Sequence, residues 1–319
     1  MAAPNRDDEP LLVRYVRASR EKAMTVHYRP YVVRERGSLW QLQRKIGEER
    51  LRMALRVSRT DVAHAQKGDT ILVPDQTDWI KLSPFPGLLP AAAKVNKLLL
   101  VSLRVQAFGA YENGVLVRWG PTSTGRQDKP TPPGIYSANW KSKERKSTID
   151  DDWVLKWAVN LDSNEGIAIH EMGLPGRPAS HSCVRLAEED AQWFFAWADG
   201  WRVATANGKI VKRGTPVVVF GEFPYGRRRP WLYVLADYRA TRVTPTELED
   251  VVTTFIKLRR RNPTAPFIPF APMGPPAPTS GNVASAPAAA PAAAASRAAA
   301  KPARGASGGG TIAGRPGTP

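Results

Sequence analysis

The sequence predicts a mostly β protein with a few helices, in which a small βααβ module precedes a β-rich domain and a disordered tail follows it. Two observations indicate this fold class. Between residues 97 and 240, short runs of β-branched and aromatic residues alternate with Gly, Asn and Pro turn signals, as in a sheet. Much of the excess in 29 prolines and 25 glycines lies in the last part of the 319 residues, where this composition predicts disorder.

The first folded unit is expected at residues 28–76, after an N-terminal segment (1–27) that carries one strand pattern at 11–16. A strand pattern at 31–33 is followed by apolar residues at helical spacing from Leu39 to Ile46 and again from Leu51 to Val57. The unit closes on Lys-Gly-Asp-Thr-Ile-Leu-Val-Pro, a turn leading into a strand that proline ends. This order predicts a βααβ module.

Residues 77–96 contain three prolines and are interpreted as a linker. The domain at 97–240 opens with a three-stranded meander whose second turn is Glu-Asn-Gly, a hairpin signal. Its strands are expected at 98–106, 107–111, 115–119, 134–138, 153–159, 166–170, 216–220 and 231–235. One helix, at 187–198, is acidic in its first turn and carries an apolar stripe that would pack on the sheet.

A C-terminal helix is expected within residues 241–262. It starts at the capping box Thr-Pro-Thr-Glu (244–247), and its apolar face continues to the basic run 259–261. Residues 263–319 are rich in Pro, Ala and Gly with scattered basic residues, and they offer too little apolar surface to offset the entropy of ordering. They are therefore expected to form a disordered basic tail.

The chain is strongly basic, with 46 Lys and Arg against 29 Asp and Glu and a formal net charge of +17. This charge favours an anionic partner such as nucleic acid, an anionic membrane surface or a cell-wall polymer. Because no acidic residue follows Asp250, part of the excess belongs to the tail. No helix-turn-helix, zinc or RNA-binding signature supports nucleic acid as the partner. No apolar run reaches the roughly 18 residues of a membrane-spanning helix.

The single cysteine, Cys183, excludes an intrachain disulfide framework and a multi-cysteine metal site. It lies in Ser-His-Ser-Cys-Val-Arg (180–185), close to His170 and His181, two of only four histidines. His170 ends a strand pattern, and Cys183 follows a Gly- and Pro-rich loop and precedes the acidic helix start. Such positions let two side chains meet across a groove. An imidazole and a nearby helix N-terminus would lower the thiol pKa from about 8.5 toward neutral, which makes a nucleophile. A small buried cysteine beside structural histidines is the alternative.

Residues 180–186 resemble the Ser-His-Gly-Cys-hydrophobic-Arg signature of L,D-transpeptidases, the YkuD-type catalytic domain. The resemblance extends over further segments in order: the meander at 98–117, Ser-Thr-Gly at 123–125, Thr-Pro-Pro-Gly-Ile-Tyr at 131–136, Gly-Ile-Ala-Ile-His at 166–170 and the strand at 214–219. It implies an L,D-transpeptidase-like β-sandwich or barrel with a packed helix.

The resemblance also implies chemistry. Cys183 would be the nucleophile that attacks a peptidoglycan tetrapeptide stem, releases the terminal D-alanine and passes the acyl group to an acceptor amine. His170 would act as general base and then general acid, oriented by the carbonyl of Glu171. An L,D-carboxypeptidase that uses water, or a peptidoglycan-binding protein without catalysis, are the alternatives.

Three further residues have implied roles. His181 would shape the pocket and assist proton transfer, and the backbone N–H groups of Ser182 and Cys183 would form an oxyanion hole. Arg185 would support the site or bind a substrate carboxylate; its alternative is an ion pair with Glu188 or Glu189. Ser182 departs from the family, which has glycine there, and the loop between His170 and Cys183 is short.

The module at 28–76 resembles a LysM domain through Tyr-Val-Val-Arg-Glu-Arg-Gly-Ser-Leu-Trp (31–40) and Gln-Lys-Gly-Asp-Thr-Ile-Leu-Val-Pro (66–74). LysM domains bind N-acetylglucosamine-containing glycans, which implies a groove bordered by Gly37, Ser38 and Leu39. A packing module without glycan affinity is the alternative.

The partners implied are peptidoglycan stem peptides and glycan strands, with no nucleic acid, transmembrane segment, metal or cofactor. The first residues lack the apolar core of a secretory signal, which alone predicts a cytoplasmic protein. The resemblance instead predicts the cell envelope or periplasm, where a lone cysteine also suits oxidising conditions. We give the catalytic motifs the greater weight.

Overall fold

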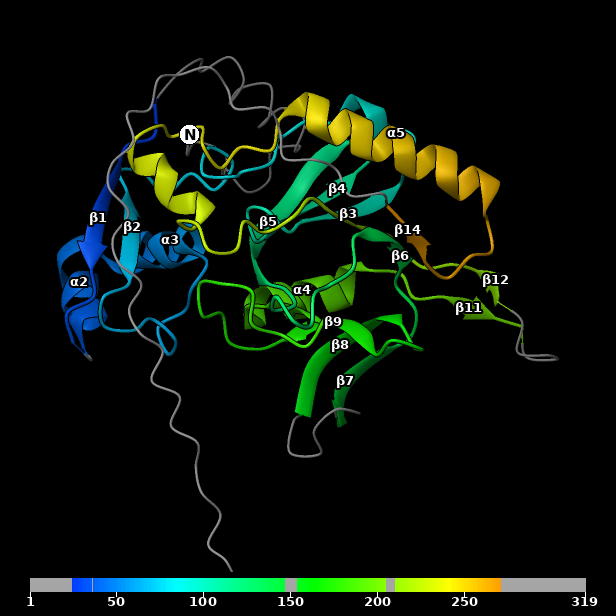
Figure 1. Cartoon of the computed structure of the whole chain (residues 1–319), viewed down its shortest axis with the longest axis horizontal. Helices are drawn as coiled ribbons and strands as arrows, with labels where there is room; N and C mark the ends of the chain where they lie inside the picture. The colour runs from blue at the N-terminus through cyan, green and yellow to red at the C-terminus, as the bar shows by residue number, and fades with distance from the viewer. Residues whose placement is uncertain (1–24, 36, 147–153, 205–209, 271–319) are drawn as a thin grey trace, which may run out of the picture. The chain divides into compact units, whose positions relative to one another are not determined.

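The computed structural model describes residues 25–35, 37–146, 154–204 and 210–270, and Figure 1 shows their arrangement. The strand expected at 11–16 and residues 271–319 of the expected tail lie outside these residues. The predicted mostly β architecture is confirmed, since a ten-stranded sheet dominates the described part of the chain. No helix within that part combines the length and apolar character needed to cross a bilayer.

The large sheet has the strand order β14-β6-β13-β3-β4-β5-β10-β9-β8-β7. Its strands, in chain order, are β3 (Lys97–Ser102), β4 (Ala107–Glu112), β5 (Val115–Ser123), β6 (Gly134–Ser137), β7 (Lys141–Lys146), β8 (Val154–Asp162), β9 (Ile167–Glu171), β10 (Val184–Leu186), β13 (Pro216–Phe220) and β14 (Ile268–Pro269). The expected meander is β3-β4-β5, and Asn113 and Gly114 turn its second hairpin with positive φ angles of 48° and 80°.

The two faces of the sheet are covered by different helices (Figure 1). Alternate residues of β3 divide between two cores, because successive side chains of a strand point to opposite faces. Leu98 and Leu100 pack in the core that includes α5 (Pro245–Arg261), whereas Leu99 and Val101 pack in the core that includes α4 (Glu188–Trp197). Both helices were predicted, and the Thr244 side chain caps α5 by accepting from the Glu247 N–H at 3.1 Å.

The module has the expected βααβ order: β1 (Tyr28–Val32), α2 (Ser38–Ile46), α3 (Glu48–Ser58) and β2 (Thr70–Pro74). β1 and β2 pair antiparallel, with Tyr28 opposite Pro74 and Val32 opposite Thr70. Its small core contains Val33, Leu39, Leu42, Leu51, Ala54 and Ile71.

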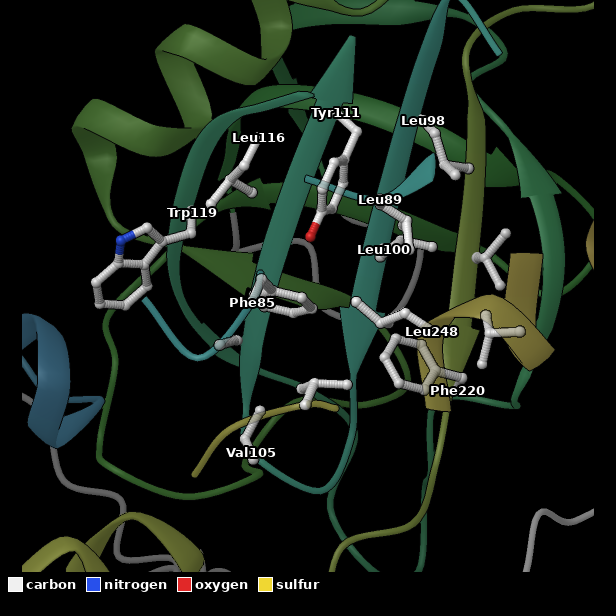
Figure 2. Packing of buried hydrophobic residues seen from close by; sticks show 14 of the residues in the cluster. Phe85, Leu89, Leu98, Leu100, Val105, Tyr111, Leu116, Trp119, Phe220 and Leu248 are labelled. Atoms are coloured by element: carbon white, nitrogen blue, oxygen red, sulfur yellow. The ribbon is translucent and has the colours of Figure 1, made fainter. Parts of the chain in front are cut away.

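The segment 77–96 is not a free linker, which corrects the sequence interpretation. Leu82, Phe85 and Leu89 are buried in the core under α5, and Figure 2 shows Phe85 and Leu89 among the packed side chains. Backbone hydrogen bonds tie the segment to the meander, including Leu89 N–H to the Gly114 carbonyl at 2.8 Å. The apolar residues between the prolines bury here and give the segment a fixed place, with a 3₁₀ turn η2 at Pro90–Ala92.

Two other expectations need correction. Residues 231–235 form part of the 3₁₀-helix η3 (Pro230–Leu235) rather than a strand. Proline at its start favours a helical turn, and the buried Trp231 and Val234 are three residues apart, which matches a 3₁₀ period. Residues 263–270 also contain β14, which pairs with β6, so the folded part continues past 262. A short hairpin, β11 (Arg202–Val203) with β12 (Ile210–Lys212), forms a separate sheet.

Buried charges join α3 of the module to the sheet domain. Arg56, 9% exposed, donates to the fully buried Asp190 of α4 at 2.8 Å and to the Trp119 carbonyl. Arg118 donates to the same carboxylate at 2.7 Å. Arg59 is also buried and donates to the Val105 carbonyl at 2.8 Å. Since a buried charge is stable only when it is paired and hydrogen-bonded, these contacts fix the module's place on the domain.

Candidate active site

The pairing of β9 with β10 fixes the positions of two of the predicted site residues, His170 and Arg185. The two strands run parallel, with Val184 opposite Ile169 and Arg185 opposite His170. Ile169 and Val184 point into the core shared with α4. Because side chains alternate, His170 and Arg185 lie on the other face. Cys183 comes just before β10, outside the paired residues.

The His170 imidazole is almost fully buried, with 2% of the residue exposed. Its Nδ1 lies 2.8 Å from the carbonyl oxygen of Glu171, the contact expected from the sequence. A carbonyl only accepts, so Nδ1 carries the proton and Nε2 holds the free lone pair. Burial lowers the pKa of His170 to about 4; the Glu171 carbonyl opposes this shift and the positive charge of Arg185 adds to it. The imidazole is therefore a neutral base at neutral pH.

Cys183 is 8% exposed, and its thiol donates a hydrogen bond to the Gly166 carbonyl, with Sγ and O 3.5 Å apart. Burial raises the pKa of the thiol; a hydrogen bond from the Ala168 backbone N–H and the charge of Arg185 act in the opposite direction. The expected lowering of the thiol pKa is therefore wrong. The desolvation of the sulfur outweighs its favourable neighbours, and α4 begins only at Glu188, beyond β10.

These two shifts define a neutral pair, a thiol and an imidazole. Among the described residues, the thiol hydrogen bond goes to Gly166 and not to His170.

Ser182 adopts a φ of 85°, in the region that favours the glycine of the family signature. Its neighbours hold it there. Thr131 donates to the Ser182 carbonyl at 2.8 Å and accepts from the Gly125 N–H at 2.9 Å. The Ser180 hydroxyl donates to the Cys183 carbonyl. A positive φ in a residue with a side chain costs about 1–3 kcal/mol, and such strain gathers at functional sites.

Arg185 does not form the ion pair that was its alternative role. Among the described residues, Glu189 pairs with Arg56 at 2.7 Å, and Glu188 accepts from Gln192. Arg185 has its Nε buried without a hydrogen-bond acceptor in that part of the chain. Burial also lowers its pKa, and the nearby Cys183 partly offsets this effect. The described residues thus show no ion pair of Arg185 with Glu188 or Glu189.

The remaining predicted residues divide between two places. His181 lies half-buried in the loop before Cys183, beside the site. Gly37, Ser38 and Leu39 lie at the start of α2, in the module. Ser38 and Leu39 are 2% and 6% exposed, so of the three only Gly37 offers open surface. The Ser38 hydroxyl accepts from the Arg34 and Glu35 N–H groups.

The sequence analysis missed two features of the module. Trp40, next to Leu39, is 61% exposed, with the Arg44 guanidinium 4.9 Å from its ring centre. An exposed indole was not distinguishable from a core residue by helical spacing alone. The module also has a hollow of about 660 Å³, whose lining includes Tyr31, Leu42, Lys45, Ile46, Arg50 and Val73. Over the described ranges, no cluster of three or more His, Cys, Asp or Glu could hold a metal ion.

Part of the chain is similar to known proteins. Residues 96–219 match the family described as the L,D-transpeptidase catalytic domain, YkuD, and this range includes His170 and Cys183. The curated protein "Probable L,D-transpeptidase 3" of Mycobacterium tuberculosis is 32% identical over 106 residues. That alignment covers 28% of this chain and 36% of the relative, so the chain spans about a third of the relative's length. The resemblance of residues 96–219 to an L,D-transpeptidase catalytic domain is thereby supported.

Solved structures are also similar to part of the chain. An L,D-transpeptidase from Xylanimonas cellulosilytica (residues 123–326) is 21% identical, with a TM-score of 0.37, over 54% of this chain and 79% of that one. An L,D-transpeptidase from Mycobacterium smegmatis is 21% identical, with a TM-score of 0.31, over 39% and 58% of the respective chains. One from Stackebrandtia nassauensis is 22% identical, with a TM-score of 0.33, over 41% and 58%.

The buried His170 predicts a specific dependence of stability on pH. The unfolded chain binds a proton at this residue near pH 6.5, whereas the folded chain binds it only near 4. The free energy of unfolding should therefore fall as pH drops through this window, by up to about 3 kcal/mol from this group. Urea unfolding between pH 7 and pH 4 should show a shallower loss in His170→Gln. The exposed-histidine variant His27→Gln should keep the wild-type dependence, and identical curves for all three proteins would contradict the assignment.

Proposed function

We propose that this protein is a cysteine-dependent L,D-transpeptidase that acts on peptidoglycan stem peptides. The observation that carries the proposal is the parallel register of β9 and β10, which sets Arg185 opposite His170, with Cys183 just before β10. The match of residues 96–219 to the L,D-transpeptidase catalytic domain supports it.

The proposed reaction has two halves. In the first, the Cys183 sulfur attacks the carbonyl carbon of the third stem residue while Nε2 of His170 takes the thiol proton. The imidazolium then gives this proton to the departing amine of D-alanine, and a thioester to Cys183 remains. In the second half, an acceptor amine attacks the thioester, His170 takes a proton from that amine, and the proton returns to the leaving sulfur. The acyl group ends on the acceptor and the enzyme is regenerated.

The burial of Cys183 and His170 determines the free-energy cost of charging them. A neutral thiol and a neutral imidazole avoid the cost of holding an ion pair in a dry site before substrate arrives. The charge appears only as the sulfur attacks, when Arg185 stabilises the negative charge that develops nearby. The backbone N–H groups of Ser182 and Cys183 are the proposed oxyanion donors, and the strained Ser182 backbone fixes their direction.

The test of this function is covalent capture. Purified protein incubated with a carbapenem should gain the mass of one molecule of the β-lactam in intact-protein mass spectrometry, because an activated thiol opens the strained ring. Cys183→Ala should gain none. With tetrapeptide stems, the wild type should release D-alanine.

The products separate the alternatives in the same assay. Cross-linked stem dimers indicate transfer, whereas tripeptides alone indicate an L,D-carboxypeptidase that uses water. If wild type forms no adduct and releases no D-alanine, the chain is a peptidoglycan-binding protein without this catalysis.

We further propose that the module at 28–76 is LysM-like and contacts wall glycan. The support is the exposed Trp40 beside Gly37, since an indole face stacks well on sugar rings, together with the hollow next to Tyr31. Such a module would hold the enzyme on its polymer and raise the local concentration of stems. Peptidoglycan lies outside the cytoplasmic membrane, so the proposed site of action is the cell envelope.

Trp40→Ala should weaken retention of the full chain on insoluble peptidoglycan by about tenfold, which corresponds to the loss of one stacked aromatic contact. Val32→Ala is the matched control, because Val32 is 50% exposed on the same module. A pull-down titration measures both. Equal retention of Trp40→Ala and wild type would remove the support for this glycan contact.

A further inference from the structure

The module touches the loop that joins the two proposed reacting residues. This catalytic loop, residues 172–182, runs from His170 at the end of β9 to Cys183 before β10. Thr60, just after α3, forms an antiparallel β-bridge with Pro175. The Asp61 N–H donates to the Leu174 carbonyl at 3.2 Å, and the Leu174 N–H donates to Oδ2 of Asp61 at 2.7 Å. One residue of the module thus holds both backbone groups of Leu174.

Asp61 is itself held in place. Its Oδ1 accepts from the His64 backbone N–H at 2.9 Å and lies 2.7 Å from Nδ1 of the same residue. The His64 ring in turn lies against the catalytic loop at Gly173. A Cβ atom on Gly173 would come within 1.9 Å of the His64 Cε1, so this contact admits no side chain. His64 therefore fixes the Asp61 carboxylate, and this carboxylate in turn holds the N–H of Leu174.

The rest of the catalytic loop is tied to the sheet domain instead. The Met172 N–H donates to the Leu186 carbonyl at 3.1 Å, and Ser123 donates to the Arg177 carbonyl at 2.7 Å. The Ala179 and Ser180 N–H groups both donate to the Thr124 carbonyl. Residues 173–175 lie between the contacts at Met172 and Arg177. Within the described part of the chain, their polar contacts with other segments come from the module.

We propose that Asp61 is a positioning residue for the catalytic loop, which it holds through Leu174 so that Cys183 keeps its place relative to His170. Leu174 is 1% exposed, and a buried N–H that loses its acceptor must either stay unpaired or move. Movement at residue 174 would reach Cys183 through residues 177–180, whose hydrogen bonds with Ser123 and Thr124 would shift with it, and Ser182 beyond them is already strained. Asp61 lies outside residues 96–219, so the module completes a site that the catalytic domain alone leaves partly unsupported.

This inference rests on the proposed function, and its test uses the full chain. Asp61→Ala removes the acceptor, so the rate constant for carbapenem acylation of Cys183 should fall at least about tenfold, since small misplacements of a reacting group are costly. Asp61→Asn keeps an amide oxygen as acceptor and should recover most of the rate. Arg52→Ala is the matched control: it removes an ion pair between module and domain, to Glu189, that does not touch the loop. It should acylate like wild type.

Hydrogen exchange gives a readout that does not depend on activity. The backbone amides of Gly173, Leu174 and Gly176 should exchange faster in Asp61→Ala than in wild type, Asp61→Asn or Arg52→Ala. If wild type is not acylated by a carbapenem, the proposed function fails, and the exchange data still decide whether Asp61 positions the loop. Unchanged exchange and unchanged acylation in Asp61→Ala would overturn the inference.

A second pair of variants tests the same contact without touching Asp61. Gly173→Ala should push the His64 ring and its carboxylate partner away from the loop and so slow acylation. His64→Ala in the same chain removes the obstructing ring but keeps the backbone N–H at this position that donates to Asp61, so it should restore the rate toward wild type. A Gly173→Ala defect that His64→Ala leaves unrelieved would show that the contact does not pass through the module, and would contradict the proposal.

Discussion

The candidate site depends on one strand pairing, that of β9 with β10. β10 is only three residues long, yet its parallel alignment with β9 decides which side chains meet. A shift of one residue would turn Arg185 into the core and bring Val184 out, because side chains alternate along a strand. The apolar residues on the core side of β9 and β10 therefore specify the positions of His170 and Arg185 on the other side. The same register of β9 with β10 thus sets both the packing of Ile169 and Val184 in the core and the positions of the proposed site residues His170 and Arg185.

Burial is the second constraint, and it acts on the whole site. It lowers the pKa of His170 and raises that of Cys183, so both groups are neutral near pH 7. In the proposed reaction, the same dry environment would strengthen the interaction of Arg185 with charge that develops on the sulfur. Elsewhere, buried charges do structural work: the Arg56–Asp190–Arg118 cluster connects α3, β5 and α4. The module and the sheet domain therefore pack against each other and are not joined by a flexible linker alone.

Local signals made much of the fold predictable. The Glu-Asn-Gly turn, the cap of α5 and the helical spacing of α4 depend on residues close in sequence, and the structure has all three. The expectations that failed depend on distant partners. The pKa of Cys183 is set by burial, the place of Phe85 by a sheet that follows it, and the contact of Asp61 with Leu174 by the docking of the module. Motif spacing indicated Cys183 and His170, but it carried no information on Asp61.

The most direct test of the central claim is the ionisation of Cys183 itself. It is the only cysteine, so the difference in absorbance at 240 nm between wild type and Cys183→Ala reports its thiolate alone. Titrated against pH, this difference should stay near zero through neutral pH and rise only above the ordinary range of a free thiol, about 8.5. A thiolate already formed at pH 6 to 7 would show an ion pair in place of the neutral thiol and imidazole, and would contradict the account.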